Sequence, residues 1–186
     1  MIQRWLLLTL TLFLALACTK HAQRPSPEVT FSGNHLLFKG ERFTGILEER
    51  FDSVETTRKT HYKNGLQDGV EEESIPTGQV VARREYRQGA KTGTHEGWYP
   101  DGKRRFHHEY RNGQNDGEVW EWYNSGSLAM YALFKEGRLL GKKMWRESGQ
   151  IYMNYVFTAD KAVGLPGTKL CFQVRNGEPE KREKGL

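Results

Sequence analysis

Six histidines are the first candidates in this 186-residue chain for binding a metal or transferring protons. His107 and His108 are adjacent, so on an extended strand they point to opposite faces and do not share an ion. His61 and His95 have no Cys or His at the spacing of zinc ligands. The sequence also contains no nucleophile elbow, phosphate-binding loop or HExxH motif. It therefore predicts no catalytic residue, no metal and no cofactor, and a protein that is not an enzyme.

Tryptophan side chains form the sharpest candidate binding feature. Trp98, Trp122 and Trp145 recur at nearly equal spacing, and Trp120 lies beside Trp122. Two interpretations stay open: the rings pack as core against neighbouring elements, or they form an aromatic ladder that stacks on a partner chain or a glycan. A basic rim is available nearby, composed of Lys103, Arg104, Arg105, Lys143 and Arg146.

Short strands separated by glycine turns must position these rings, and the stretch from Tyr110 to Phe134 shows them best. It holds two runs rich in strand-forming residues, EVWEWY and LAMYALF. Asn112-Gly113 and Asp116-Gly117 precede the first run, and Asn124-Ser125-Gly126 separates the two. Glycine adopts positive φ without a Cβ clash, so these pairs favour hairpin turns. The stretch predicts one β-hairpin and the turn that leads into the next.

The same pattern recurs with a period of 24 residues. Tyr62, Tyr86, Tyr110 and Phe134 each open a unit. We predict that two glycine series with this spacing define the turns: Gly65, Gly89, Gly113 and Gly137, and Gly69, Gly93, Gly117 and Gly141. A third series is Gly78, Gly102, Gly126 and Gly149, in which the last member comes one residue early. One residue is therefore missing between Gly141 and Trp145, and the internal repeat decides the fold.

Alternation along the second strand of each unit predicts a sheet with two different faces. One face is predicted to carry the first residue of each of these strands, Val80, Arg104, Leu128 and Ile151. The same face carries an apolar column, Ala82, Phe106, Met130 and Met153. It also carries an aromatic column, Tyr86, Tyr110, Phe134 and Phe157. The opposite face is polar in the early units and more apolar later, at Tyr131 and Leu133. Carboxylates such as Glu71 and Glu73 are interpreted as solvated.

These motifs resemble the MORN repeat, and more closely its variant in bacterial antitoxins of the YwqK type. The first half of the unit reads YKNG, YRQG, YRNG and FKEG at Tyr62, Tyr86, Tyr110 and Phe134, and the second half reads GWYPDG, EWYNSG and MWRESG. The match covers most of residues 62–157 well and 38–61 weakly. The resemblance implies an all-β fold, an elongated antiparallel meander of tandem β-hairpins, with atypical first and last units as caps. It also implies a protein partner, which in that family is a toxin.

Residues 1–17 have the composition of a signal peptide, with Arg4 ahead of an apolar run from Trp5 to Ala17 that is too short to span a bilayer. This segment is expected to be the signal helix that precedes the meander. The sequence LALAC resembles a bacterial lipobox, in which the cysteine, here Cys18, carries the lipid. Ala15 departs from the usual leucine, and plain secretion is the alternative. Thr19 and Lys20 resemble lipoproteins sorted to an outer membrane, where the host has one.

The remaining boundaries follow from composition. Residues 18–30 contain two prolines and polar residues, which predicts a flexible tether after the lipidated cysteine. The repeat domain is expected over 31–175, and residues 176–186 form a charged, disordered tail. Cys171 alternates with apolar neighbours and is interpreted as a half-buried strand thiol. The net charge of +5 is spread along the chain, so nucleic acid is not expected as a partner.

Three functions remain open from the sequence. An extended repeat array provides surfaces rather than pockets, which favours a membrane-anchored protein-interaction module, antitoxin-like or immunity-like. The alternative is a cell-envelope module that binds lipid headgroups or cell-wall polymer, and a purely structural spacer is the plainest possibility. The absence of a single polybasic run counts against headgroup binding.

The lipid anchor can be tested at Cys18. We expect Cys18→Ser to lose membrane association, because the acyl chains supply the apolar area that holds the protein on a bilayer. Fractionation of cells into membrane and soluble pools measures this, with Cys171→Ser as the control that should stay in the membrane. Retention of Cys18→Ser in the membrane would place the anchor elsewhere.

Overall fold

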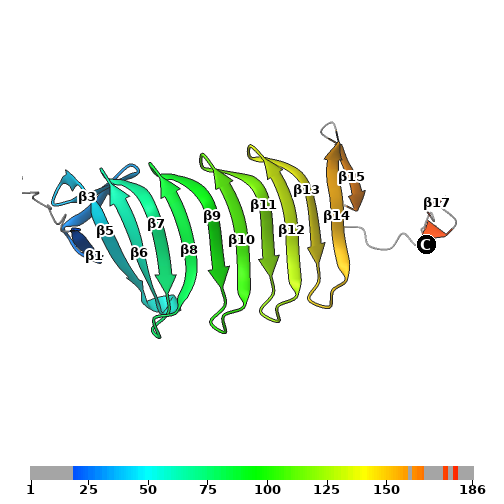
Figure 1. Ribbon diagram of the computed structural model, residues 1–186, viewed down its shortest axis with the longest axis horizontal. Coiled ribbons are helices and arrows are strands. Elements are labelled where there is room, and N and C mark those ends of the chain that lie inside the picture. Colours follow the sequence, from blue (N-terminus) through cyan, green and yellow to red (C-terminus); the bar gives the residue numbers. More distant parts are fainter. Residues whose placement is uncertain (1–18, 159–160, 166–173, 176–177, 180–186) are drawn as a thin grey trace, which may run out of the picture.

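The computed structural model describes residues 19–158, 161–165, 174–175 and 178–179. The strands of its main sheet are β1 (His21–Arg24), β5 (Gly45–Phe51), β6 (Thr56–Lys63), β7 (Leu66–Ser74), β8 (Val80–Arg87), β9 (Ala90–Trp98), β10 (Arg104–Arg111), β11 (Gln114–Trp122), β12 (Leu128–Lys135), β13 (Arg138–Trp145), β14 (Ile151–Thr158) and β15 (Lys161–Leu165). These twelve strands are hydrogen-bonded in sequence order, and from β5 onward every pair is antiparallel. Figure 1 shows the hairpins side by side in one layer along the long axis. The predicted all-β meander is confirmed.

The four hairpins β6–β7, β8–β9, β10–β11 and β12–β13 each close in a two-residue turn whose second residue is glycine. At Asn112-Gly113 the φ angles are 50° and 82°, and two positive values match the right-handed twist of the flanking strands. The Gly113 N–H donates to the Lys91 carbonyl of the preceding hairpin at 2.9 Å. The equivalent bonds run from Gly65 to Phe43, from Gly89 to Gln67 and from Gly137 to Asn115, at 2.7, 2.7 and 2.8 Å. The turns therefore join successive units as well as closing each one.

The second glycine series does not form turns, which corrects the sequence prediction. Gly69, Gly93, Gly117 and Gly141 lie inside β7, β9, β11 and β13, at positions where the strand register shifts. In the third hairpin Tyr110 pairs with Asn115 and His108 with Val119, so β11 contains extra residues around Gly117. These are β-bulges, which bend a strand and increase its twist.

A side chain on the preceding strand covers the bulge in several units. The Glu109 carboxylate accepts a hydrogen bond from the Glu118 N–H at 2.9 Å, directly after Gly117. In the first unit the His61 ring lies at the same repeat position, with Nδ1 2.7 Å from the Val70 carbonyl. The bulge glycines leave room for these side chains, because a Cβ on Gly117 would meet the Glu109 side chain.

The far ends of the hairpins are tied by tyrosines that the sequence reasoning passed over. Tyr99 Oη donates to the Trp122 carbonyl at 2.7 Å, and Tyr123 Oη donates to the Trp145 carbonyl at 2.8 Å. Each bond joins the turn of one unit to the strand end of the next. The tyrosine of the Trp-Tyr pair in the repeat motif therefore has a structural role.

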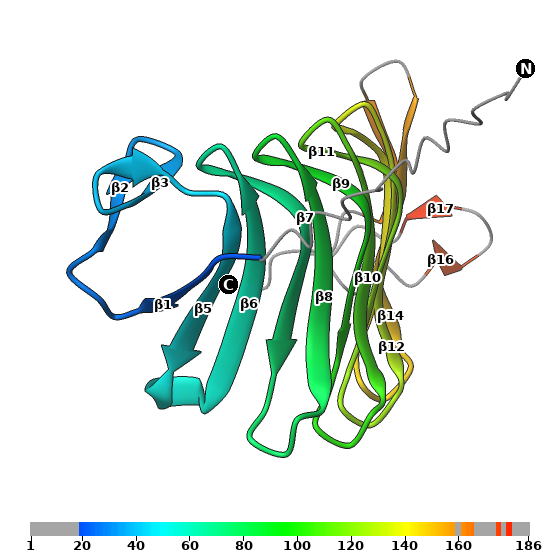
Figure 2. The ribbon, with the colours of Figure 1, turned by 60° about the vertical axis from the view of Figure 1, so that its left-hand side comes forward.

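A small sheet covers the N-terminal end of the meander, as Figure 2 shows. It contains β2 (Val29–Ser32), β3 (His35–Phe38) and β4 (Glu41–Arg42). Its apolar side chains close the hydrophobic core together with those of β1, β5, β6 and the β4–β5 connection: Ala22, Val29, Leu36, Phe43, Leu47 and Tyr62, with Phe38 at its edge. A short 3-10 helix (Asp52–Val54) joins β5 to β6, and β16 (Val174–Arg175) pairs with β17 (Glu178–Pro179).

The predicted tether over residues 18–30 is wrong for its central part. His21–Arg24 forms β1, which pairs in parallel with Ile46–Glu49 of β5, and Ala22 is buried in the core. Backbone hydrogen bonds and apolar burial outweigh the polar composition that suggested a linker. The signal peptide 1–17, Cys18, Cys171 and most of the tail 176–186 lie outside the described residues.

The two faces can be assigned from the strand pairings. Face A carries Glu71, Arg84, Tyr110 and Ala132, and face B carries Glu72, His107, Trp120 and Tyr131. Ala82, Phe106, Met130 and Met153 share face A as predicted. The first residues of these strands lie on face B instead, because a bulge directly after each of them reverses the alternation. They are Val80, Arg104, Leu128 and Ile151.

The crowding at the bulge can be measured with two alanine substitutions. Gly117 has φ +123° and lies against Glu109, whereas Gly102 has φ +86° with open space where a Cβ would be. Backbone strain of this kind costs on the order of 1–3 kcal/mol. We expect Gly102→Ala to lower the free energy of unfolding by that amount and Gly117→Ala to lower it further. Urea denaturation measures both, and equal losses would contradict the bulge contact.

Candidate functional site

All four tryptophans of the predicted ladder lie on face B. Trp98, Trp122 and Trp145 pair with Arg104, Leu128 and Ile151 at the hairpin ends, and Trp120 pairs with His107 and Tyr131. All four rings are half-buried. In the described part of the chain, ring contacts join Trp120 to Trp122 and Tyr131, while Trp98 and Trp145 have no ring contact to Trp122. The rings share a face as predicted, but they do not stack as one ladder.

Trp120 is the best-held of these rings. It stacks on Trp122 with centroids 6.2 Å apart and planes 15° from parallel, and its centroid lies 4.3 Å from that of Tyr131. Its Nε1–H donates to Glu118 Oε2 at 3.1 Å, while Tyr131 Oη donates to Glu118 Oε1, also at 3.1 Å. Burial, and then the Glu118 carboxylate, raise the pKa of the Tyr131 hydroxyl, which favours the protonated donor. One carboxylate thus fixes two aromatic rings.

An apolar row continues this surface toward β15. Leu133 pairs with Gly141, Gly141 with Val156, and Val156 with Val163. These apolar side chains are well exposed, at 37% for Leu133, 53% for Val156 and 57% for Val163. We call Trp120, Tyr131, Leu133, Val156 and Val163 the C-terminal patch. The face therefore becomes more apolar toward the C-terminus, as the sequence predicted.

The C-terminal patch surrounds a shallow hollow of about 330 Å³, lined by Tyr131, Leu133, Gly141, Lys143 and Val156 among others. Gly141 keeps it open, since a Cβ there would lie 3.1 Å from Val156 Cγ1. Lys143 borders the hollow, with its Nζ 5.2 Å from the centre of the Trp145 ring, a cation–π distance. The Tyr131, Leu133 and Val156 side chains were not singled out as a site in the sequence.

Repeat position explains why the hollow occurs here. Leu133 stands 24 residues after Glu109, whose carboxylate covers the bulge at Gly117. The bulge at Gly141 is narrower than the one at Gly117, because β13 has one residue fewer than β11. Gly141 also has no positive φ, unlike Gly117. The missing residue and the change from glutamate to leucine therefore coincide, and together they expose apolar side chains.

Face A has a charged cluster at its N-terminal half, and here the interpretation of solvated carboxylates is wrong. Glu71 is 4% exposed. Its carboxylate lies 2.9 Å from Arg84 Nη1 and 3.8 Å from Arg58 Nε, and accepts a bond from Thr60 Oγ1 at 3.3 Å. Burial alone would raise the pKa of the neighbouring Glu73 carboxyl, but Arg58 and Arg84 hold it below its usual value. Paired charges with several hydrogen bonds are typical of a structural network.

His95 is also structural. It is 2% exposed, its ring lies 5.4 Å from that of Tyr86 and 4.5 Å from that of Tyr110, and Nε2 is 2.8 Å from the Glu85 carbonyl. Burial lowers the pKa of the imidazole, which favours the neutral ring that donates to this carbonyl. Over the described residues, no three His, Cys, Asp or Glu side chains gather into a possible metal site.

Comparisons with known proteins return no match, either to a family model or to a curated sequence. The resemblance to MORN repeats and to the YwqK type therefore rests on the motif residues and stays a prediction. No helix in the described ranges is long and apolar enough to span a membrane.

The buried histidine predicts a pH dependence of stability. The folded state holds the His95 pKa below its ordinary value of 6.5, so the unfolded chain binds the proton more tightly. The full stability is present above pH 6.5 and is lost as the pH falls from there through the lower, folded-state pKa. His95→Gln keeps a donor without the titration, so its unfolding free energy should decline less between pH 7 and pH 5. Parallel declines in urea melts would contradict this.

Proposed function

We propose that the protein is a non-enzymatic interaction module whose C-terminal patch docks a partner protein. The observation that carries the proposal is the exposed apolar-aromatic surface at one end of one face. Surfaces of this kind mark protein interaction sites in soluble domains. Aromatic side chains held rigid before binding lose little entropy when a partner covers them, and Trp120 and Tyr131 are held in this way by Glu118.

The chemistry of the patch indicates the chemistry of the partner. Leu133, Val156 and Val163 provide an apolar centre, and Lys143 provides positive charge beside it. A complementary surface has apolar side chains at its centre and carboxylates at its rim, which steer association and fix orientation. A toxin is the class of partner that the sequence resemblance implies. This makes an antitoxin-like or immunity-like role our proposal for the module.

Location forms the second part of the proposal. A chain exported by its signal peptide and lipidated at Cys18 would be held at the bacterial envelope, on the outer membrane where the host has one. The repeat array would then present the C-terminal patch at the end remote from the anchor, because the sheet runs in sequence order from β5 to β15. A partner could approach that end without contacting the bilayer.

Site-specific photo-crosslinking in the native host tests the docking surface. A photoreactive amino acid replaces Val156, which is 53% exposed in the patch, or Lys59, an exposed side chain on the same face four hairpins away. We expect a discrete protein adduct from position 156 and none from position 59. Adding Leu133→Lys should reduce the adduct about tenfold, which corresponds to about 1.4 kcal/mol of binding free energy.

The chemical identity of the adduct decides between the two functions. A protein adduct that Leu133→Lys reduces by about this factor supports the module. An adduct of lipid or cell-wall polymer at position 156 would contradict protein docking and favour the envelope-binding alternative. Equal protein adducts at both positions, or none at position 156, would contradict the patch as the docking surface.

A further inference from the structure

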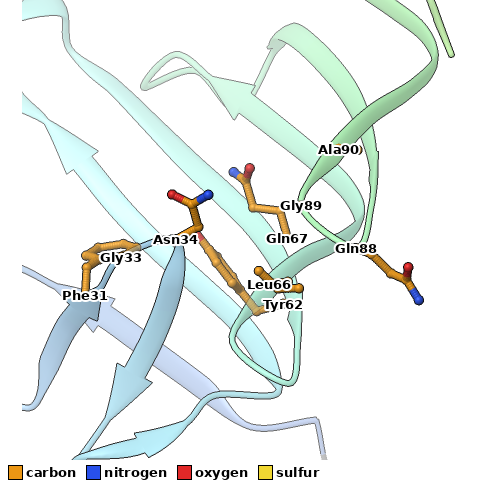
Figure 3. Close-up of a pocket in the computed structure, with 9 residues that line it drawn as sticks. All are labelled: Phe31, Gly33, Asn34, Tyr62, Leu66, Gln67, Gln88, Gly89 and Ala90. Carbon is orange, nitrogen blue, oxygen red and sulfur yellow. The ribbon is translucent and has the colours of Figure 1, made fainter. Parts of the chain in front are cut away.

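A second hollow lies at the opposite end of the array and has a different character. It occupies about 620 Å³ between the β2–β3 turn and the turns that follow β6 and β8. The Leu36 N–H donates to the Gly65 carbonyl at 2.7 Å, which fixes the small sheet against the first hairpin turn. Figure 3 shows side chains from three separate segments of the chain around this space. The volume falls within the range of about 300–1,000 Å³ for small-molecule sites.

Side-chain amides supply the polar groups of this hollow. Asn34, Gln67 and Gln88 each come from a different segment, and Figure 3 shows the Gln88 side chain directed away from the other two amides. In the described part of the chain, the Asn34 amide bonds to no other group, and Gln67 makes one long bond of 3.4 Å to Glu71. A carboxamide both donates and accepts hydrogen bonds. The Asn34 and Gln67 amides therefore retain most of their hydrogen-bonding capacity for a ligand.

The main chain around the hollow is already bonded. The Gly89 N–H donates to the Gln67 carbonyl at 2.7 Å, and the Gln88 N–H donates to Asp68 Oδ2 at 3.1 Å. The Gly65 N–H donates to the Phe43 carbonyl, and the Gly65 carbonyl accepts from the Leu36 N–H. A peptide that adds as a strand needs unpaired main-chain groups on its host. The turns offer few such groups, which counts against a peptide.

Two aromatic rings complete the lining. Phe31 is 45% exposed, and the Arg24 guanidinium lies 5.3 Å from the centre of its ring. The Tyr62 ring points toward Asn34 in Figure 3 and is 8% exposed. Burial, with Glu49 and Glu71 nearby, raises the pKa of the Tyr62 hydroxyl to about 12, so it stays protonated. The hollow thus combines apolar ring surface with neutral donors and acceptors.

We propose that this hollow binds a neutral saccharide, either a short oligosaccharide or the end of a longer glycan. Sugar hydroxyls donate and accept like the Asn34 and Gln67 amides, and the C–H face of a pyranose ring packs on an aromatic ring as other apolar groups do. Among the residues that the structure describes, none of those lining the hollow is charged, so a charged ligand would lose hydration without a compensating partner. This inference is independent of the C-terminal patch.

The test uses the purified chain labelled with ¹⁵N and followed by NMR. The probes are maltotriose, cellotriose, mannotriose, galactotriose and chitotriose, each titrated to 20 mM. We expect at least one probe to shift the side-chain amide signals of Asn34 and Gln67 in a saturable way. Asn34→Ala and Gln67→Met should each weaken the binding at least fivefold, and Gln150→Ala, at an exposed amide in a distant turn, should leave it unchanged.

Each other outcome counts against the proposal. Absence of saturable shifts with all five probes would overturn it, and so would shifts that Gln150→Ala weakens as much as Gln67→Met. Shifts confined to the tryptophans of face B would place saccharide binding on the other surface and overturn the assignment to this hollow. Backbone amide spectra of the variants report whether the fold is retained.

Discussion

The array depends on one hydrogen bond that recurs from unit to unit, in which the amide of a turn glycine donates to a carbonyl of the preceding hairpin. It is formed at Gly65, Gly89, Gly113 and Gly137, each time over 22 residues. The bond requires a turn with positive φ at two successive residues, which glycine in the second position permits. Asp68 and Asp116 reinforce it by accepting from the N–H of the next turn, at Gln88 and Glu136. This geometry keeps the first glycine series on a strict period.

A one-layer sheet has consequences for how the chain is stabilised. A repeat in such an array contacts only its neighbours, so its stability is close to a sum of unit and interface terms. Interior positions of the meander are only partly covered, and few side chains there are fully buried, such as Ala82, Val119 and Ala132. The closed core lies at the N-terminal end, under β2–β4. That end acts as a cap, and the opposite end of the described sheet exposes its apolar side chains.

Much of the fold followed from the sequence, because turn glycines and alternating strands are local signals. The bulges did not, since Asp116-Gly117 has the same local preference in a turn and in a bulge, and the pairing with β10 decides between them. The buried charge of Glu71 was missed because Arg58 and Arg84 reach it from neighbouring strands. β1 was missed because its partner, β5, is distant in sequence and parallel to it. In each case the deciding contact is non-local.

For the candidate sites as well, local features could be predicted from the sequence and non-local contacts could not. The face of Trp120 and Trp122 was predictable from spacing, whereas the role of Glu118 in holding Trp120 and Tyr131 required the register of β11 against β12. The 620 Å³ hollow has no motif, because its lining residues come from three separate segments. The polar hollow beside the cap and the apolar patch at the far end lie many strands apart.

The imperfect unit of the repeat is the part of the sheet that bears most directly on function. At Glu109 the unit covers its bulge with a carboxylate; one period later the same position is Leu133, and the bulge has lost a residue. A change that served only the stability of the sheet would not be expected to exchange a hydrogen-bonded carboxylate for a leucine exposed to solvent. Leu133, Gly141 and Val156 instead lie next to one another and form one apolar surface with Tyr131. A departure that costs a local hydrogen bond and creates a contiguous apolar surface is the pattern expected where a repeat has been adapted to contact another molecule.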